Sequence, residues 1–269
     1  VSMINAMHTA FGDLPFVYMY IDDIVIASIS YSEHLTHLEI FFKRLIQVNL
    51  KINPSKAKLC ASSIKFLGFD ITNNKVTIPK AKAHAITQIR PPTNRKEVMQ
   101  TVGNLNYYRK FVPGYARVME PIMSLLRKEV KFEWGPNQQR AFDTIKAKME
   151  SDIATYLPTE QGHFIIMTDS SHTHYSGVLM QVDAKGIKRL VAAYSGAWKS
   201  AARKYAIFFK ESQALYQSIK HFKFYLQNVK FTTYCDCRSV LFLKRAAQNH
   251  DKFYRMAIEL SQYNFDLIH

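Results

Sequence analysis

The chain has 269 residues, of which 48% are hydrophobic and 21% charged, a composition that is typical of folded globular proteins and excludes a disordered chain. Its apolar runs are only a few residues long, which excludes a membrane-spanning helix, and no secretory signal sequence precedes the first expected element. The net charge of +15 favours a polyanionic partner such as nucleic acid, although a merely soluble basic protein has the same balance.

The first third of the chain is expected to contain two hairpins separated by a helix. Residues 16–28 (FVYMYIDDIVIAS) form an apolar, β-rich run, which predicts a hairpin with Asp22 and Asp23 at its tip. Residues 32–49 have the apolar spacing of a helix that is capped by the serine at its start. Residues 64–78 predict a second hairpin, with its turn at the two adjacent asparagines.

Helices are expected after the proline pair at 91–92. Asn94 and Glu97 have the spacing of a capping box, so a helix is predicted to begin there. Pro121 is expected at or near the first turn of a second helix. Pro136 suits the first turn of a third helix.

From about residue 163 the pattern returns to strands. Three strands are expected to form an antiparallel meander, followed by a long helix, a fourth strand, two more helices and a final strand. The three meander strands, the long helix and the last two strands are expected at residues 163–169, 177–183, 187–193, 204–227, 231–236 and 264–269.

Asp22 and Asp23 are the first residues that indicate chemistry. Two adjacent carboxylates in an apolar hairpin raise each other's pKa and are costly to ionise together. A pair of divalent cations removes that cost and can hold the attacking and leaving oxygens of a phosphoryl transfer. A plain polar turn is the alternative, because Asp-Asp is a common turn pair.

A second set of acids is spread over the last third of the chain. Asp169 and Asp236 end expected strands, and Glu211 lies on the long helix between them. Carboxylates on such elements can converge on a metal pair and activate water to cut a phosphodiester, but their spacing alone does not distinguish such a site from a chance trio. Cys235 and Cys237 flank Asp236, and strand alternation predicts both sulfurs on the opposite face, in the core.

Three weaker patterns have plainer explanations. Two histidine pairs, His34 with His37 and His172 with His174, lack the further ligands of a zinc site and are expected at the surface. Residues 107–110 (YYRK) fit either stacking on bases with phosphate contact or aromatic packing beside solvated charges. Three cysteines without a disulfide framework indicate a reducing compartment.

Several segments together resemble, in family order, the reverse transcriptases of long-terminal-repeat retroelements, most closely the gypsy-type group. Residues 17–28 are similar to the palm hairpin, residues 64–72 (IKFLGFDIT) to the segment that grips the primer strand, and residues 89–134 to the thumb. Residues 164–171 (FIIMTDSS) and their successors resemble a ribonuclease H domain, which has the same order of strands and helix.

The resemblance implies an α+β fold in three parts. Residues 1–90 would be the back part of a polymerase palm and residues 91–160 a helical thumb or connection. Residues 161–269 would be an α/β ribonuclease H-like domain with a mixed five-stranded sheet. Both ends are expected to be cuts in a longer chain, with a third palm aspartate upstream and a fourth nuclease acid downstream. The chain alone is therefore not expected to polymerise.

The resemblance also implies the activity, an RNA-directed DNA polymerase with ribonuclease H activity on RNA–DNA hybrids, using Mg²⁺ or alternatively Mn²⁺. The implied partners are an RNA template, a DNA primer, an RNA–DNA hybrid and deoxynucleotides, with no membrane. The implied place is inside the cell, in a cytoplasmic particle or the nucleus. The implied catalytic and metal-binding residues are Asp22, Asp23, Asp169, Glu211 and Asp236.

The implied nucleic-acid-binding residues are Tyr20, Phe66, Leu67, Gly68 and Phe69. Without the resemblance, the last four would be read as a core strand with a hairpin glycine.

Some positions depart from the family pattern, which leaves a second hypothesis open. Residues 170–172 read Ser-Ser-His where relatives have a second aspartate, Ser176 replaces a usual glycine, and Ala202 replaces a usual polar residue. The alternative is a catalytically inactive or host-adopted relative that binds nucleic acid.

The positive charge generates a prediction for binding to an RNA–DNA hybrid. With about six phosphate contacts, the affinity is expected to fall about a thousandfold between about 50 and 200 mM salt, because binding releases counterions. A salt titration followed by fluorescence anisotropy measures this, and a flat response would exclude a basic binding face.

Overall fold

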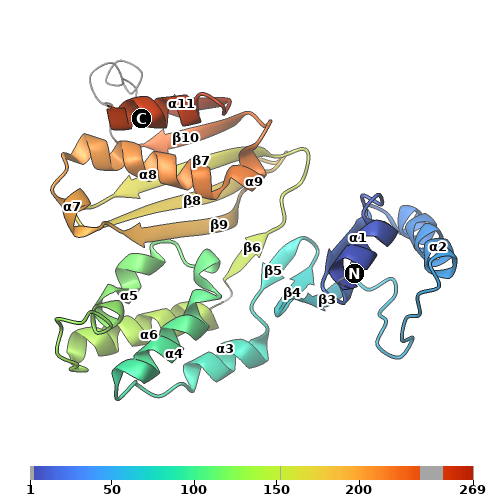
Figure 1. The fold of residues 1–269 in the computed structure, drawn as a ribbon, viewed down its shortest axis with the longest axis horizontal. Helices are drawn as coiled ribbons and strands as arrows, with labels where there is room; N and C mark the ends of the chain where they lie inside the picture. The colour runs from blue at the N-terminus through green and yellow to red at the C-terminus, as the bar shows by residue number, and fades with distance from the viewer. Residues whose placement is uncertain (1–2, 152, 237–250, 269) are drawn as a thin grey trace. The chain divides into compact units, whose positions relative to one another are not determined.

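The computed structural model describes residues 3–151, 153–236 and 251–268 and forms two compact units, Val1–Asn73 and Asn74–His269 (Figure 1). Within the described ranges, no helix has both the length and the apolar character needed to cross a membrane.

The first unit contains two helices and two hairpins. Its elements are α1 (Met3–Phe11), β1 (Val17–Tyr20), β2 (Asp23–Ile26), α2 (Tyr31–Gln47), β3 (Ser63–Phe66) and β4 (Phe69–Thr72). β1 and β2 are antiparallel with Tyr20 opposite Asp23, so the predicted first hairpin is confirmed. α1, β1 and α2 share one apolar core, made of Met7, Ala10, Phe11, Val17, Phe41 and Leu45.

The cap of α2 differs from the prediction. Ser30, not Ser32, is the N-cap, and its Oγ accepts a hydrogen bond from the Glu33 backbone N–H at 3.2 Å. The Glu33 carboxylate in turn accepts the Ile29 backbone N–H at 2.7 Å, which completes a reciprocal cap. Either serine suits a cap by type, and only Ser30 has a glutamate three residues later.

The second hairpin also differs, because residues 64–71 do not form one strand. Leu67 and Gly68 have φ values of +48° and +73° and reverse the chain, so that Phe66 of β3 lies opposite Phe69 of β4. Two successive residues with positive φ make the turn that matches the twist of paired strands. The predicted turn at Asn73 and Asn74 is present as well, with φ values of +48° and +63°.

The second unit begins with helices. They are α3 (Lys80–Thr87), α4 (Arg95–Asn106), the short 3₁₀ helix η1 (Arg109–Phe111), α5 (Tyr115–Ser124) and α6 (Pro136–Glu150). α3 was not predicted. Asn94 caps α4 and accepts the Glu97 N–H at 3.0 Å, and Pro136 opens α6, both as predicted. Pro121 lies inside α5 rather than in its first turn, so that prediction was wrong.

A mixed five-stranded sheet follows, in the order β11-β10-β7-β8-β9, which confirms the predicted architecture. β7, β8 and β9 are an antiparallel meander, and β10 runs parallel to both β7 and β11. The strands are β7 (His163–Ser170), β8 (His174–Val182), β9 (Lys188–Ala197), β10 (Phe231–Cys235) and β11 (Phe265–Ile268). A short pair, β5 (Lys75–Thr77) with β6 (Ala154–Tyr156), is antiparallel.

The helix expected over residues 204–227 is divided into α8 (Ile207–His221) and α9 (Lys223–Leu226), and α7 (Ser200–Arg203) precedes it. One of the two helices expected after the fourth strand is α11 (Asp251–Leu260). The other falls on residues 237–250, outside the described part of the chain.

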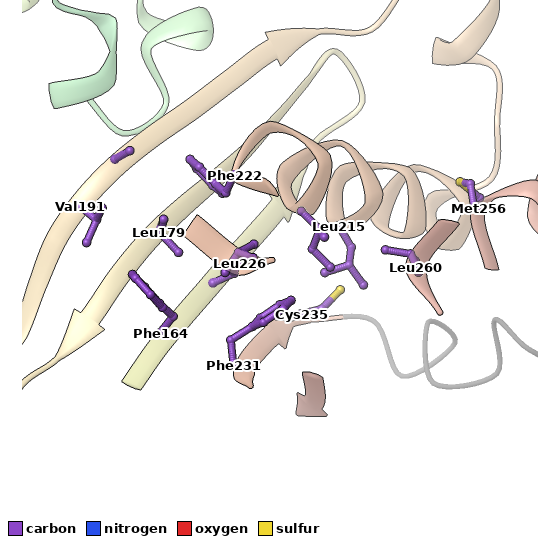
Figure 2. Packing of buried hydrophobic residues seen from close by; sticks show 13 residues of the cluster. Phe164, Leu179, Val191, Leu215, Phe222, Leu226, Phe231, Cys235, Met256 and Leu260 are labelled. Atoms are coloured by element: carbon purple, nitrogen blue, oxygen red, sulfur yellow. The ribbon is translucent and has the colours of Figure 1, made fainter. Parts of the chain in front are cut away.

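The core of the second unit lies between α8 and the sheet. Phe164 and Ile166 alternate along β7 toward Leu215 and Ile219 of α8, as strand periodicity requires. Figure 2 shows this cluster of side chains packed between the helix and the strands. The packing fixes where α8 stands over the ends of β7 and β10, and thereby where its polar residues lie.

Two neighbouring residues of β7 test this core. Ile166 is fully buried and Met167 is 47% exposed. Ile166→Ala is expected to lower the free energy of unfolding by about 2–5 kcal/mol, because it removes buried methyl groups and leaves a cavity. Met167→Ala, the matched control, is expected to change it by much less. Denaturant unfolding measures both, and equal losses would contradict the assigned orientation of β7.

Candidate functional site

The Asp22–Asp23 pair lies at the tip of the first hairpin. Asp22 is in the turn and Asp23 begins β2. Both are exposed, as are Tyr20 and Ile21, at 53% and 52%. The carboxylates are thus open to solvent rather than buried against the protein, and a ligand can reach them.

The turn beside the pair is strained. Ile21 has φ +57°, a left-handed conformation that β-branched residues rarely adopt. Such a residue costs about 1–3 kcal/mol and persists only where the surroundings impose it. Here Val17, in the core of the unit, holds one end of the hairpin.

His34 and His37 of α2 contact residues that flank this hairpin. The Ser28 hydroxyl contacts the Nδ1 atoms of both His34 and His37, at 3.1 and 2.8 Å, and the His37 ring stacks on Phe16 at 3.8 Å. Both histidines were predicted at the surface, and both are half-buried. Through Ser28 and Phe16 they contact the residues on either side of the hairpin that carries the aspartates.

The four other predicted contact residues lie together at the tip of the β3–β4 hairpin. Phe69 is buried, Phe66 and Leu67 are half-buried, and Gly68 is exposed. The left-handed conformation of Gly68, with φ +73°, explains the glycine there.

The second set of acids converges at one end of the five-stranded sheet. β10 is parallel to β7, with Cys235 beside Thr168. One residue further along each strand, Asp236 follows Cys235 and Asp169 follows Thr168, and both are exposed. Because neighbouring strands are about 4.8 Å apart, the two carboxylates leave the sheet side by side.

Glu211 completes the set from α8, which packs on β7. It is only 5% exposed. Its Oε2 accepts a hydrogen bond from the Cys235 thiol at 3.8 Å, and its carboxylate also accepts the Ser170 backbone N–H. Burial, followed by the negative charges of Asp169 and Asp236, raises the pKa of Glu211 to about 7. The charges of Asp169 and Asp236 therefore reach Glu211, although 42 residues separate Asp169 from Glu211 in the sequence.

The chemistry of this donor set fits a hard divalent cation. Mg²⁺ and Mn²⁺ prefer carboxylate oxygens, and a cation would remove the repulsion that opposes ionisation of Glu211. In the described residues, however, no three His, Cys, Asp or Glu side chains stand close enough to hold a metal.

Cys235 is buried in the core, at 4% exposure, as predicted from strand alternation. Cys237 lies outside the described residues. The sequence did not indicate that the Cys235 thiol also contacts Glu211, because that contact depends on how α8 packs on the sheet.

Two buried polar residues were missed, and one of them, Lys210, directly precedes Glu211. His174 was expected at the surface and is 8% exposed, with its Nδ1 2.9 Å from the Thr173 hydroxyl. Lys210, next to Glu211, is 3% exposed, and its Nζ lies 3.4 Å from His172 Nδ1. The burial of Lys210 depends on which face of α8 packs against the protein. From its charge alone, an exposed side chain is expected.

The YYRK segment packs within its own unit for the most part. Tyr108 is buried, and the guanidinium of Arg109 lies 5.8 Å from the Tyr194 ring centre. Lys110 lies over the Phe111 ring at 5.3 Å. Tyr107 remains 51% exposed.

Two family models match the chain. Residues 2–71 match reverse transcriptase (RNA-dependent DNA polymerase), and residues 134–233 match the RNase H-like domain found in reverse transcriptase. The chain carries the reverse transcriptase and ribonuclease H-like regions of a retrotransposon polyprotein. It is 30% identical over 255 residues, 93% of its length, to the transposon Tf2-3 and Tf2-7 polyproteins of Schizosaccharomyces pombe. It spans 19% of the length of these relatives.

Solved structures share the fold. A foamy viral protease–reverse transcriptase in complex with double-stranded DNA has a TM-score of 0.82 and 18% identity, over 99% of this chain and 57% of that one. The same kind of enzyme in complex with an RNA/DNA hybrid has a TM-score of 0.82 over 98% of this chain and 37% of that one. The predicted α+β fold of a partial palm, helical thumb and ribonuclease H-like domain is thereby confirmed.

The raised pKa of Glu211 predicts how stability depends on pH. Its folded-state pKa of about 7 exceeds the ordinary 4.5, so ionisation is disfavoured in the folded protein. The resulting loss of stability is absent below pH 4.5, grows as pH rises, and is complete above pH 7. Glu211→Gln is therefore expected to be more stable than the wild type at pH 8 by on the order of 1–3 kcal/mol, and equally stable near pH 4.

Thermal unfolding without divalent cations measures this, with the exposed Glu160→Gln as a control that changes little. Mg²⁺ at pH 8 should then stabilise the wild type more than Glu211→Gln, because a ligand bound by the folded state shifts its equilibrium. If the wild type became more stable than Glu211→Gln as the pH rises from 4.5 to 7, the raised pKa assigned to Glu211 would be contradicted.

Proposed function

We propose that this chain forms part of an enzyme with two phosphoryl-transfer sites, an RNA-directed DNA polymerase and a ribonuclease H. In this proposal, residues 1–90 belong to the palm, residues 91–160 to the thumb or connection, and residues 161–269 to the nuclease. These domain limits follow the resemblance to the family, whereas the two compact units divide between Asn73 and Asn74. The observation that carries the proposal is the convergence of three acids at the ends of β7 and β10, with the pKa of Glu211 raised.

At the nuclease site, the residues would act as cation ligands. When bound, a pair of Mg²⁺ or Mn²⁺ ions would activate water and stabilise charge on the phosphate. Asp169, Glu211 and Asp236 would hold the ions. The Cys235 and Ser170 hydrogen bonds hold the Glu211 carboxylate in place, and its burial excludes water from that side. The substrate would be the RNA strand of an RNA–DNA hybrid.

At the polymerase site, Asp22 and Asp23 would hold Mg²⁺ for the addition of deoxynucleotides to a DNA primer on an RNA template. Their exposure and the strained turn at Ile21 support this role. Tyr20 would lie by the primer end, and the β3–β4 hairpin (residues 66–69) would position the primer backbone. The free thiols of Cys60 and Cys235 fit a reducing, intracellular setting.

A nucleic-acid-binding relative without catalysis is the second candidate. The favouring observation is the departure from the family pattern beside the acids, at Ser171, His172 and Ser176, the last of which lies opposite Asp169 in the β7–β8 ladder. Against it, all five proposed catalytic carboxylates are present, and Glu211 keeps a burial that is unfavourable without a cation. Both candidates bind a hybrid, and only the enzyme cleaves it in a Mg²⁺-dependent way.

Reciprocal substitutions test the two sites, in the protein together with the polyprotein sequence on either side of it. Asp22→Asn is expected to abolish DNA synthesis and to spare RNA cleavage, because it removes a ligand from one site only. Asp169→Asn is expected to stop RNA cleavage while synthesis continues. Primer-extension and hybrid-cleavage assays measure each activity. Undiminished synthesis by Asp22→Asn would remove the palm assignment, and loss of both activities in Asp169→Asn would indicate misfolding.

A further inference from the structure

The loop after Asp169 has a fixed conformation. The Ser171 backbone N–H donates to the His174 carbonyl at 2.8 Å, and the Ser171 hydroxyl accepts the backbone N–H groups of Thr173 and His174, at 3.3 and 2.9 Å. The Trp198 indole N–H donates to the Ser171 carbonyl at 3.2 Å. His172, at the tip of this loop, is thus held three residues from Asp169, and its side chain is exposed.

Lys210 lies beneath that histidine. Its side chain is 3% exposed, and its ammonium is 3.4 Å from His172 Nδ1. In the described part of the chain, no carboxylate forms an ion pair with Lys210, although buried lysines are ordinarily paired with one. The contact with His172 therefore accounts for the position of this ammonium, directly before Glu211 on α8.

The pairing decides which ring nitrogen of His172 carries the proton. An ammonium can only donate, so Nδ1 must accept, and a neutral imidazole then has its proton on Nε2. Nε2 is the other polar atom of the ring, on the side away from Nδ1. The loop therefore presents a neutral N–H donor three residues after Asp169, over the lysine that precedes Glu211.

We propose that His172 donates this Nε2–H to a phosphodiester oxygen of the bound hybrid, and that Lys210 is the positioning residue that sets its tautomer. This inference rests on the proposed nuclease function and adds a substrate contact to it. A neutral donor suits the place, because an arginine there would pair with Asp169 or Asp236 and compete with a cation for their oxygens. It also contacts a phosphate without adding to the charge of the site.

Hybrid binding by the full chain, measured by anisotropy in EDTA to prevent cleavage, tests the contact. His172→Ala is expected to weaken binding about tenfold, the effect of one lost hydrogen bond to a charged group. The slope of log affinity against log salt should stay unchanged, because a neutral donor releases no counterion. His163→Ala, an exposed histidine at the opposite end of β7, is the matched control and should bind as the wild type does.

Lys210→Met should weaken binding as much as His172→Ala, and the double variant no further, because the lysine acts through the histidine. Lys210→Arg, which still donates to Nδ1, should restore most of the affinity. A slope that falls by about one in Lys210→Met would mean that the lysine itself contacts phosphate, which overturns the assigned roles. Thermal unfolding of each variant checks that the fold is retained.

The tautomer gives a readout that needs no substrate. The ¹⁵N shifts of the His172 ring should show an Nε2–H tautomer in the wild type and a mixture in Lys210→Met. A wild type with the proton on Nδ1 overturns the proposal. So does wild-type affinity in His172→Ala, which leaves the nuclease function standing. A wild-type chain that does not bind the hybrid overturns the proposed function together with this contact.

Discussion

The burial of the Glu211 carboxylate beside Asp169 and Asp236, at one end of the five-stranded sheet, is the constraint on which the candidate site of the second unit depends. Asp169 and Asp236 emerge together because β7 and β10 are parallel neighbours, and Glu211 is buried beside them. The raised pKa of Glu211 reports the free-energy cost of this arrangement. A fold keeps such a cost only where packing elsewhere imposes it.

That packing is the apolar layer between α8 and the strands. Leu215 and Ile219 lie on the same helix as Glu211, one and two turns further along, and they share one buried cluster with Phe164 and Ile166 of β7. Burial of a few such side chains contributes several kcal/mol, enough to offset one disfavoured ionisation. The core thus stabilises the unit and also positions Glu211, the carboxylate whose ionisation is disfavoured.

In the hairpin of the first unit, too, packing in the core compensates for an unfavourable feature beside acidic residues. There the unfavourable element is the backbone of Ile21, held left-handed beside Asp22 and Asp23, and the compensating element is the core around Val17 and Phe41. Local strain or repulsion at acidic residues, balanced by packing a few residues away, is therefore common to both candidate sites.

The sequence by itself determined the features that depend on short-range periodicity. The Asp22–Asp23 hairpin, the cap at Asn94 and the meander of β7 to β9 follow from local patterns, and the five acids were named from them and from family likeness. Only the tertiary structure decided what depends on contacts between distant segments. It placed Pro121 inside α5, turned the chain at Leu67, buried Lys210 and brought Glu211 against Cys235. The reason is physical, since burial and pKa arise from whichever residues pack nearby, and these are remote in the chain.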